Sequence, residues 1–346
     1  MKVLHDPDWR SANTYQGKLA AGLERAGVDV VFTDSTSAVL LLTRQVHRHR
    51  PAIIHLHWVQ DYFAVNEPNL LRFVGRHLLA WLDLWIVTTL LRCPVVWTVH
   101  NLTAHEARRP DADRRARRFL ARRCAALFCH GPSGVEAIVR TLGVPPDRVV
   151  TAPHPSYADD HRLDADRDEA RDQLGMDRDA FVCAFVGGYR PYKGLDDLVA
   201  AFSDLDDPEA RLVLAGRGME AVTAPDDDRV RIHDAFLPAD ELRFWFAAAD
   251  VIVLPFRSVF TSGSLLLAMS FGKPVIATDV GLVGDSLDDA GGWLVPPADR
   301  NSLLLALNAA RTADLDAMGR HNALKMKDLT PDHLVQPTLR TYQRIA

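Results

Sequence analysis

A turn with two cations follows one of the apolar segments of the chain. The stretch VGGYRPYKG (186–194) has two consecutive glycines, then Arg190 and Lys193, and Gly194 precedes a segment with helical spacing. Glycine lets a backbone approach a ligand closely or adopt positive φ. Arg190 offers a planar fork of donors and Lys193 a compact charge. Because the start of a helix also presents free N–H groups, the turn predicts a site for an anion such as a diphosphate.

A second turn of small residues, TSGS (261–264), precedes another apolar helical segment. Ser262, Gly263 and Ser264 could offer backbone N–H groups and hydroxyls to the same anion. The two turns contain no GxxxxGK[ST] loop and no GxGxxG fingerprint, and GRGME (216–220) is too short a glycine pattern for a dinucleotide site. The predicted diphosphate site therefore consists of the two cations and the TSGS turn.

The elements that must position these residues are short apolar strands alternating with helices. In the first half the strand-like runs cover residues 2–5, 28–32, 52–57, 94–100, 125–130 and 148–152, and in the second half 181–187, 211–216, 229–233, 250–255, 273–279 and 292–296. Continuous apolar strands between helical segments indicate parallel sheets covered on both faces. The predicted fold class is α/β, with two doubly wound domains in series.

The division of the chain follows from its turn residues and from its length of 346 residues. We expect a first domain over 1–152, a linker over 153–160 where two prolines occur, and a second domain over 161–330. Ligands of such sheets bind beyond the carboxyl ends of the strands, so the cleft between two such domains is the expected site. Most of the candidate site residues lie at predicted strand ends: His5, His57, His100, His130, Arg190 and Arg217.

Composition and charge limit the classes of protein that fit. Hydrophobic residues make up 48% and charged residues 25%, as in soluble globular proteins. No secretory signal or membrane-spanning segment is visible, and four cysteines without a CxxC pair fit a reducing compartment, so a cytoplasmic location is expected. The net charge of −5 and the lack of a recognisable module argue against a nucleic-acid partner.

Taken together, the motifs resemble a known family. RPYKG, AADVIVLPF, SGS and LAMSFGKPVIATD follow one another in the second half, and ANTYQGKLAAGLERAG, IIHLHWVQ and VVWTVHNLTAHE in the first. This order resembles GT-B glycosyltransferases, in particular bacterial polysaccharide or glycolipid enzymes similar to the glycosyl-group-1 family, over nearly the whole chain. The resemblance implies two Rossmann-like domains facing a central cleft and a nucleotide-sugar donor held mainly by the second. It also implies that Arg190 and Lys193 bind the diphosphate and that a C-terminal helix (331–346) crosses back to the first domain.

The chain departs from the family at two positions. Many retaining members have two glutamates eight residues apart, and Val259 and Leu267 stand at those places here. Neither side chain can hydrogen-bond a sugar or ribose hydroxyl, so those donor contacts are not carried over. The loss favours a branch with inverting enzymes and leaves the retaining alternative open.

An inverting transfer needs a general base for the acceptor hydroxyl. The candidates are His100, His105 and Glu106 in VHNLTAHE, with Asp8 and Asp61 as alternatives. The resemblance implies that His100 faces the donor sugar and its phosphate. We select His100 and Glu106 as catalytic residues. The competing interpretations are a satisfied strand-end histidine for His100 and a carboxylate that fixes the loop for Glu106.

No metal or other cofactor is expected. The sequence Asp6-Pro7-Asp8 matches the DxD metal motif of another glycosyltransferase fold, but one match in an Asp-rich chain is weak, and GT-B enzymes generally use no catalytic metal. Stabilisation of the leaving diphosphate is instead expected from Arg190, Lys193 and the helix starts.

The acceptor side is expected in the first domain. Residues 70–93 mix Leu, Phe and Trp with arginines, and residues 107–126 add eight further arginines. A basic, amphipathic surface suits peripheral contact with an anionic membrane, where a lipid-linked acceptor could be reached. A buried helix followed by a solvated basic helix is the competing interpretation.

The sequence thus predicts a hexosyltransferase that uses a GDP- or UDP-linked sugar and a saccharide or lipid-linked acceptor. Two alternatives stay open: a nucleotide-sugar epimerase on the same fold, and a non-catalytic partner protein that keeps the fold, which the residues at 259 and 267 suggest.

Overall fold

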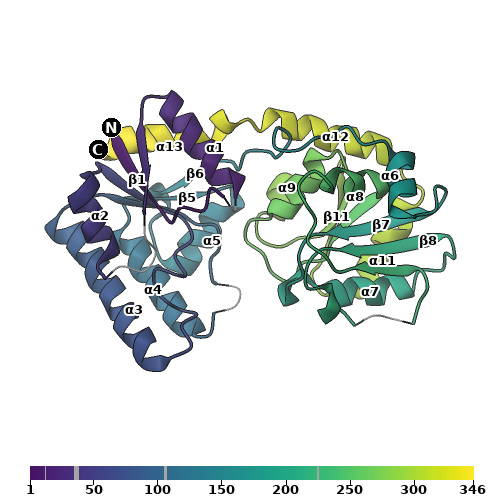
Figure 1. Cartoon of the computed structure of the whole chain (residues 1–346), viewed down its shortest axis with the longest axis horizontal. Coiled ribbons are helices and arrows are strands. Elements are labelled where there is room, and N and C mark those ends of the chain that lie inside the picture. The colour runs from purple at the N-terminus through teal and green to yellow at the C-terminus, as the bar shows by residue number, and fades with distance from the viewer. Residues whose placement is uncertain (12, 35–38, 105–106, 224–225) are drawn as a thin grey trace. The chain divides into compact units, whose positions relative to one another are not determined.

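The computed structural model describes residues 1–11, 13–34, 39–104, 107–223 and 226–346. The described chain divides into two compact units (Figure 1). The first unit is Met1–Pro155 together with Pro331–Ala346, and the second is Ser156–Thr330. Each unit contains its own parallel sheet and its own apolar core, so the α/β class with two doubly wound sheets is confirmed.

The sheet of the first unit has the order β2-β1-β3-β4-β5-β6 in the described residues, with each neighbouring pair parallel. Its strands are β1 (Lys2–Asp6), β2 (Asp29–Phe32), β3 (Ile53–Leu56), β4 (Val95–Thr98), β5 (Ala126–Cys129) and β6 (Val149–Thr151). β3, β4 and β5 are buried along their whole length, as expected for strands covered on both faces.

Helices cover both faces of this sheet. They are α1 (Thr14–Arg25), α2 (Leu41–His49), α3 (Leu70–Trp85), α4 (Pro110–Arg123), α5 (Ser133–Leu142) and α13 (Pro331–Ile345), and α3 continues into a π-helical turn over Ile86–Leu90. α13 lies beside α1 (Figure 1), where a Cβ at Gly22 would overlap the side chain of Val335. The last helix of the chain is thereby part of the first unit.

The second unit has the strand order β12-β11-β10-β7-β8-β9 in its described part, again all parallel. The strands are β7 (Phe181–Val186), β8 (Ala210–Ala215), β9 (Val230–His233), β10 (Val251–Leu254), β11 (Val275–Thr278) and β12 (Gly292–Val295). The helices are α6 (Arg167–Leu174), α7 (Leu195–Ser203), α8 (Leu242–Ala248), α9 (Gly263–Ser270), α10 (Val283–Ser286), α11 (Arg300–Ala310) and α12 (Leu315–Asp328). Strand order reverses between β7 and β10, which places a ligand crevice at their carboxyl ends.

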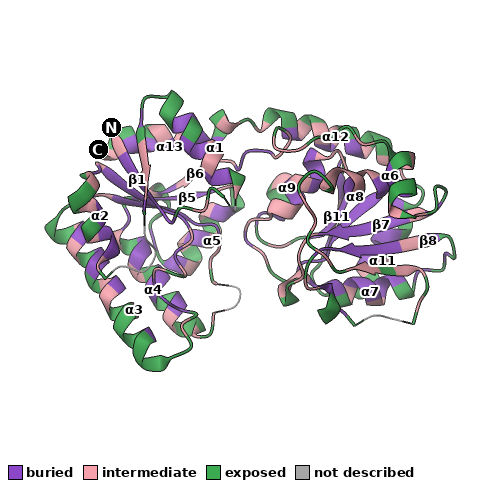
Figure 2. Ribbon diagram, viewed as in Figure 1, coloured by how far each residue is buried: buried purple, intermediate pink, exposed green. Residues whose placement is uncertain are grey.

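The inner strands form the buried centre of each unit, the edge strands β2 and β9 are only partly buried, and the outer faces of the helices are exposed (Figure 2). Trp97 and Phe128 are among the largest buried side chains of the first unit, and Phe185, Phe202 and Phe246 of the second. Burying aromatic and aliphatic side chains supplies about 25 cal/mol for each Å² of apolar surface removed from water. Among the described helices, none is long and apolar enough to cross a bilayer.

Candidate active site

A cavity of about 460 Å³ lies at the carboxyl ends of β7 and β8 in the second unit. It is lined by Val186, Gly187 and Gly188 after β7, Gly216 and Arg217 after β8, Phe236, Leu237 and Leu242 before and within α8, Gly263, Ser264 and Leu267 of α9, and Tyr157 and His161. The cavity therefore joins the glycine pair and the small-residue turn that the sequence placed in one site. Its position follows the rule for doubly wound sheets.

Glycines bring the two strand-end loops into backbone contact. Gly216 has a φ of 146°, and a Cβ there would overlap the carbonyl of Gly187. The Tyr189 N–H donates to the Arg217 carbonyl at 2.8 Å, which ties the two loops together. A side chain at Gly216 would both strain the backbone and push the loops apart.

Lys193 is held next to the wall of this cavity. A Cβ at Gly187 would lie 3.5 Å from the Lys193 Nζ, and the ammonium lies 5.3 Å from the centre of the Phe185 ring. Burial, followed by the charge of Arg190, lowers the pKa of Lys193 to about 8. The described residues give Lys193 no carboxylate partner, so a bound anion would relieve the cost of keeping this cation half-buried.

Arg190 and Arg217 add two further cations on exposed loops. The Arg190 guanidinium donates to the carbonyl of Tyr189 at 2.9 Å, and Arg217 lies over the ring of Phe236 at 4.6 Å. Arg217 lines the cavity, whereas Arg190 is not among its described lining residues and its charge acts on Lys193. These cations give the carboxyl end of the β7–β8 pair a positive character.

The amino end of α9 is the helix start that reaches the cavity. Ser262 caps it by accepting the N–H of Leu265 at 3.1 Å, and Gly263 and Ser264 form its first turn in the cavity wall. The Tyr157 hydroxyl would lie 3.1 Å from a Cβ at Gly263, so this position is closely packed by an aromatic group. Because the first N–H groups of α9 have no helical acceptors, they favour an anion.

The start of α7 differs from the sequence expectation. Gly194 has a φ of 68° and precedes the helix, but Asp196 and Asp197 occupy its first turn. The Asp197 carboxylate accepts both donors of the Arg257 guanidinium at 2.8 Å. The chain thus supplies its own carboxylates at this helix start, and the described lining of the cavity contains no residue of α7.

His100 lies in the first unit, two residues after the end of β4, and is 8% exposed. Its ring stacks on Trp58 at 4.2 Å and meets the Tyr15 ring edge-on at 5.0 Å. Burial, together with the neighbouring imidazoles, lowers the pKa of His100 well below its ordinary value, so the ring is neutral at physiological pH. Glu106, the second predicted catalytic residue, and the alternative His105 lie outside the described residues.

His100 belongs to a group of buried imidazoles. His5, His55 and His57 have ring nitrogens within 4.8 Å of one another. His55 is engaged by the hydroxyls of Tyr342 and Thr98, and His5 faces His57 at 3.1 Å.

Both carboxylates of the DxD-like sequence have structural partners in the first unit, whereas Asp61, the other alternative base beside Asp8, is exposed. Asp6 accepts the Thr33 hydroxyl at 2.8 Å, and Asp8 forms an ion pair with Arg10 at 2.8 Å. The DxD-like sequence therefore places its two carboxylates on different partners.

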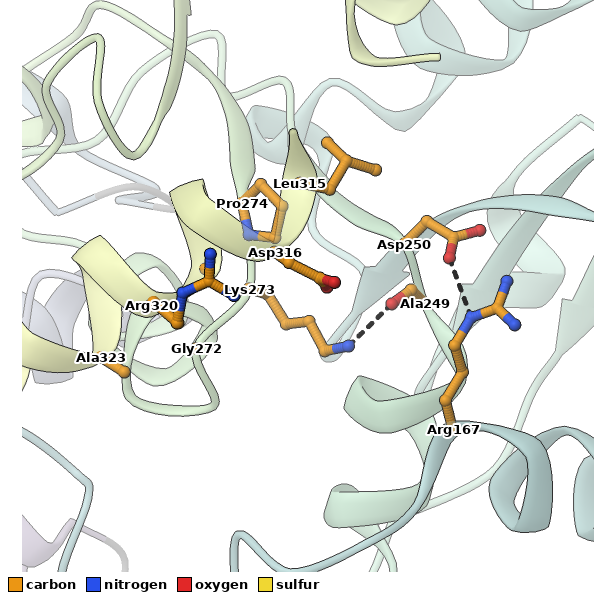
Figure 3. A pocket seen from close by; sticks show the side chains of 11 residues that line it. Arg167, Ala249, Asp250, Gly272, Lys273, Pro274, Leu315, Asp316, Arg320 and Ala323 are labelled. Carbon is orange, nitrogen blue, oxygen red and sulfur yellow. Dashed lines mark hydrogen bonds and ion pairs between the residues drawn. The ribbon is translucent and has the colours of Figure 1, made fainter. Parts of the chain in front are cut away.

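A second cavity, of about 310 Å³, lies at the amino ends of β10 and β11 (Figure 3). Three cations line it among the described residues, Arg167, Lys273 and Arg320. Two of them have partners in the protein: Lys273 donates to the carbonyls of Ala247 and Ala249 at 3.2 and 2.8 Å, and Arg167 pairs with Asp250 at 3.1 Å. It lies at the strand ends where doubly wound sheets do not bind ligands. We assign it a structural role.

Several cavity residues were not predicted from the sequence. Tyr157 and His161 fall in or beside the expected linker, and Phe236, Leu237 and Leu242 come from a loop and helix without a charged motif. The short run Phe236-Leu237-Pro238 is the available sequence signal for Phe236. Leu267, which replaces a family glutamate, lines the cavity with an apolar side chain.

Part of the chain matches a known protein family, and curated relatives match more of it. Residues 180–311 match the family model described as glycosyl transferases group 1. The GDP-mannose:glycolipid 4-beta-D-mannosyltransferase of Xanthomonas campestris pv. campestris is 27% identical over 72% of this chain and 68% of its own length. The D-inositol 3-phosphate glycosyltransferase of Streptomyces bingchenggensis is 27% identical over 88% of this chain and 79% of its own length.

Solved structures show the same fold over the whole chain. Sucrose-phosphate synthase of Thermosynechococcus elongatus has a TM-score of 0.74 and 19% identity, covering 99% of this chain and 98% of its own. Anabaena Alr3699/HepE, solved in complex with UDP-glucose, has a TM-score of 0.72 and 17% identity, covering 99% and 100%. With this domain, this fold and these relatives, the chain is a glycosyltransferase of the GT-B type that contains a glycosyl transferases group 1 domain.

Proposed function

We propose that the protein transfers a hexosyl unit from a GDP- or UDP-linked sugar to a saccharide or lipid-linked acceptor without a metal. The observation that carries this proposal is the cavity at the carboxyl ends of β7 and β8, with Lys193 beside it and the start of α9 in its wall. The two donor classes are supported by relatives whose names or bound molecules include GDP-mannose and UDP-glucose.

In this proposal the diphosphate lies against Lys193, Arg190 and the first turn of α9, formed by Gly263 and Ser264 behind the cap Ser262. Cations and helix N–H groups stabilise the negative charge that develops on the leaving diphosphate, which is the electrostatic task that a metal performs in other transferases. Arg217 provides a further donor in the cavity wall. Leu267 offers no hydrogen bond to the sugar, which favours inverting chemistry.

The first unit supplies the acceptor chemistry in this scheme. Transfer requires that the acceptor oxygen lose its proton while it bonds to the anomeric carbon and the diphosphate leaves with the bonding electrons. Glu106 is the proposed base. His100, held neutral, contributes a donor and an acceptor nitrogen rather than a positive charge.

A thermal-shift screen with GDP, UDP, dTDP and ADP and their common sugars tests the donor proposal. A ligand at 100 times its dissociation constant should add about 2.7 kcal/mol of stability. We expect a shift with GDP or UDP in the wild type and a much smaller one in Lys193→Ala. A folded sample that no nucleotide stabilises would favour the non-catalytic alternative.

The epimerase alternative has no observation of its own in its favour. Incubation with donor alone separates it from a transferase: an epimerase returns a rearranged or hydrolysed sugar at full rate, whereas a transferase needs an acceptor.

The acceptor side includes an exposed apolar face of α3. Leu71, Val74, Leu78, Leu82 and Trp85 recur at helical spacing and are exposed, Leu71 by 83%. Arg72 and Arg76 on the same helix are also exposed. Such a face can enter the headgroup region while its arginines contact anionic lipids.

We therefore propose a cytoplasmic protein that contacts the inner face of the membrane through α3. Some arginines of α4 have structural partners instead: Arg117 pairs with Asp113 inside the unit, and Arg118 donates to the carbonyl of Thr141. Flotation with vesicles of phosphatidylcholine, with or without phosphatidylglycerol, tests the contact. Binding should require the anionic lipid and be lost in Leu71→Glu/Leu78→Glu. Equal flotation of this variant and the wild type would contradict it.

A further inference from the structure

Four imidazoles of the first unit stand in one hydrogen-bonded series. Nδ1 of His5 lies 3.1 Å from Nε2 of His57, Nδ1 of His57 lies 3.4 Å from Nε2 of His100, and Nδ1 of His100 lies 3.4 Å from Nε2 of His130. The last Nδ1, that of His130, lies 2.9 Å from the carbonyl oxygen of Ala152. His5 lies near the end of β1, and the other three follow the ends of β3, β4 and β5, so the order of these adjacent strands sets the order of the rings.

The Ala152 carbonyl gives the series a direction. A carbonyl oxygen can only accept, so His130 must carry its hydrogen on Nδ1. A neutral His130 then has its lone pair on Nε2, which obliges His100 to donate from Nδ1. The same reasoning passes to His57 and to His5, so each neutral ring donates from Nδ1 and accepts at Nε2.

The series ends at Nε2 of His5. This buried nitrogen has no hydrogen-bond partner among the described residues. In the direction that the carbonyl sets, this unpaired atom is a lone-pair nitrogen and carries no hydrogen, and the ring around it packs against Phe32 and His55. The free end therefore agrees with the direction that the carbonyl sets.

The surroundings keep the four rings neutral. They pack against the aromatic rings of Tyr15 on α1, Trp58 and Phe32, and the charged group acting on the series is Arg10, at the His5 end. Burial is the first cause that lowers the pKa of each ring, to about 3 for His5 and about 4 for His130. Neutral imidazoles are the state that the hydrogen-bond direction requires.

We propose that His57 and His130 are positioning residues that hold His100 as a neutral imidazole with its hydrogen on Nδ1 and its lone pair on Nε2. The role in catalysis rests on the proposed function, in which His100 meets the substrates; the tautomer itself does not. The two bonds of His100, both 3.4 Å long, are the longest of the series, so a ligand could replace either of them. A ligand hydroxyl would then donate to Nε2, and a ligand oxygen would accept from Nδ1–H.

Long-range ¹H–¹⁵N NMR of the histidine-labelled full chain near neutral pH tests the tautomer without any substitution. We expect His5, His57, His100 and His130 to show the Nδ1–H form, which is the less common form of neutral histidine. His55, which bonds two hydroxyls outside the series, serves as an internal reference. An Nε2–H form or an imidazolium at His100 would overturn the proposal.

Two substitutions at one position test the positioning role. His130→Asn keeps a donor for the Ala152 carbonyl but removes the acceptor for His100, whereas His130→Gln can place an amide oxygen where Nε2 accepted. The Asn variant should release the tautomer of His100 and lower kcat for GDP-mannose or UDP-glucose by about tenfold or more with KM nearly unchanged, because a wrong tautomer disables a catalytic histidine. The Gln variant should restore both the tautomer and the rate.

The outcomes separate this proposal from the proposed function. Nδ1–H at His100 with no turnover or binding of any nucleotide sugar would reject the function and keep the tautomer assignment. Turnover that is unchanged in His130→Asn, in a folded protein, would reject the positioning role and keep the function.

Discussion

The ammonium nitrogen of Lys193 lies over the ring of Phe185, 5.3 Å from its centre. Phe185 belongs to β7, and Gly187, just beyond the end of that strand, leaves the space that Lys193 Nζ adjoins. β7 thus supplies the aromatic ring that contacts the cation, and the turn directly after β7 supplies the glycine that leaves space for the cavity. This arrangement makes Lys193 the most direct test of the anion site.

Lys193→Met should weaken binding of the nucleoside diphosphate by about 10- to 100-fold, because a charge-assisted hydrogen bond contributes roughly 1.5–3 kcal/mol. Lys273→Met is the matched control. Burial also lowers the pKa of Lys273 to about 8, but its ammonium donates to carbonyls in the other cavity. The control should lose stability and keep its affinity. Calorimetric titration and urea unfolding of both variants measure this, and similar affinities in the two would argue against the site.

Nucleotide affinity should also depend on alkaline pH. Lys193 is charged below its pKa of about 8 and neutral above it, so an anion loses its partner as pH rises through 8. A bound diphosphate raises that pKa, and the dissociation constant should therefore increase by up to about tenfold per pH unit above 8. Titrations between about pH 7 and pH 9.5 check this. Lys193→Arg keeps its charge and should bind with a flat profile; a flat wild-type profile would contradict the assignment.

The fold could be predicted from the sequence because its strands are buried on both faces. Runs such as AIIHLH and DVIVLP read as continuous apolar segments, and each became a strand of a parallel sheet. The order of the strands could not be read in this way. It depends on which crossover packs on which face, and no local pattern specifies that β7 lies between β8 and β10.

The candidate site was predictable where the chemistry is local. Lys193 and the α9 turn come from short motifs, and the structure brings Gly187, Gly263 and Ser264 to one cavity. Tyr157 and Phe236 are contributed by distant loops, whose approach depends on tertiary packing. The sequence placed His5, His57, His100 and His130 at predicted strand ends, but it could not predict that they form one series, because their order depends on the order of the strands.

Mild acid should destabilise the protein through its buried histidines. His5, His130 and His154 have pKa values of about 3, 4 and 3 in the folded state, below the ordinary 6.5. Between the folded pKa values and 6.5, these histidines are protonated in the unfolded chain but neutral in the folded chain. The free energy of unfolding is therefore highest above about pH 6.5 and decreases as the pH falls toward 4. Each such histidine contributes about 1.4 kcal/mol per pH unit.

Asp6 acts in the opposite direction. Burial raises its pKa to about 6, so the folded state binds this proton more readily and gains stability as pH falls through 6. One carboxyl cannot offset several histidines, so the free energy of unfolding should still decrease as the pH falls. Urea unfolding at stepped pH between about 7.5 and 5 measures how the free energy of unfolding changes with pH. His154→Gln should reduce this pH dependence by the contribution of one histidine, about 1.4 kcal/mol per pH unit. A free energy of unfolding that stays constant over this range would mean that the imidazoles are not buried as described.

Arg171 and Arg167 share the carboxylate of Asp250 but should differ greatly in their effect on stability. The Arg171 side chain is 0% exposed, pairs with Asp250 at 2.8 Å and also donates to the carbonyls of Ala248 and Ala180. The Arg167 side chain is 43% exposed and pairs with the same carboxylate at 3.1 Å. Removing a buried partner leaves a charge and carbonyls unsatisfied, whereas removing an exposed one lets water replace it.

Arg171→Met should therefore cost about 3–5 kcal/mol of unfolding free energy, and Arg167→Met at most about 1 kcal/mol. The same urea unfolding measures both, and neither variant should change nucleotide affinity, because both arginines lie away from the β7–β8 cavity. Equal losses of unfolding free energy in the two variants would mean that the ion pair with Asp250, and not the burial of Arg171, determines the contribution of these arginines to stability. A loss of affinity in Arg167→Met would instead assign a ligand role to the cavity at the amino ends of β10 and β11.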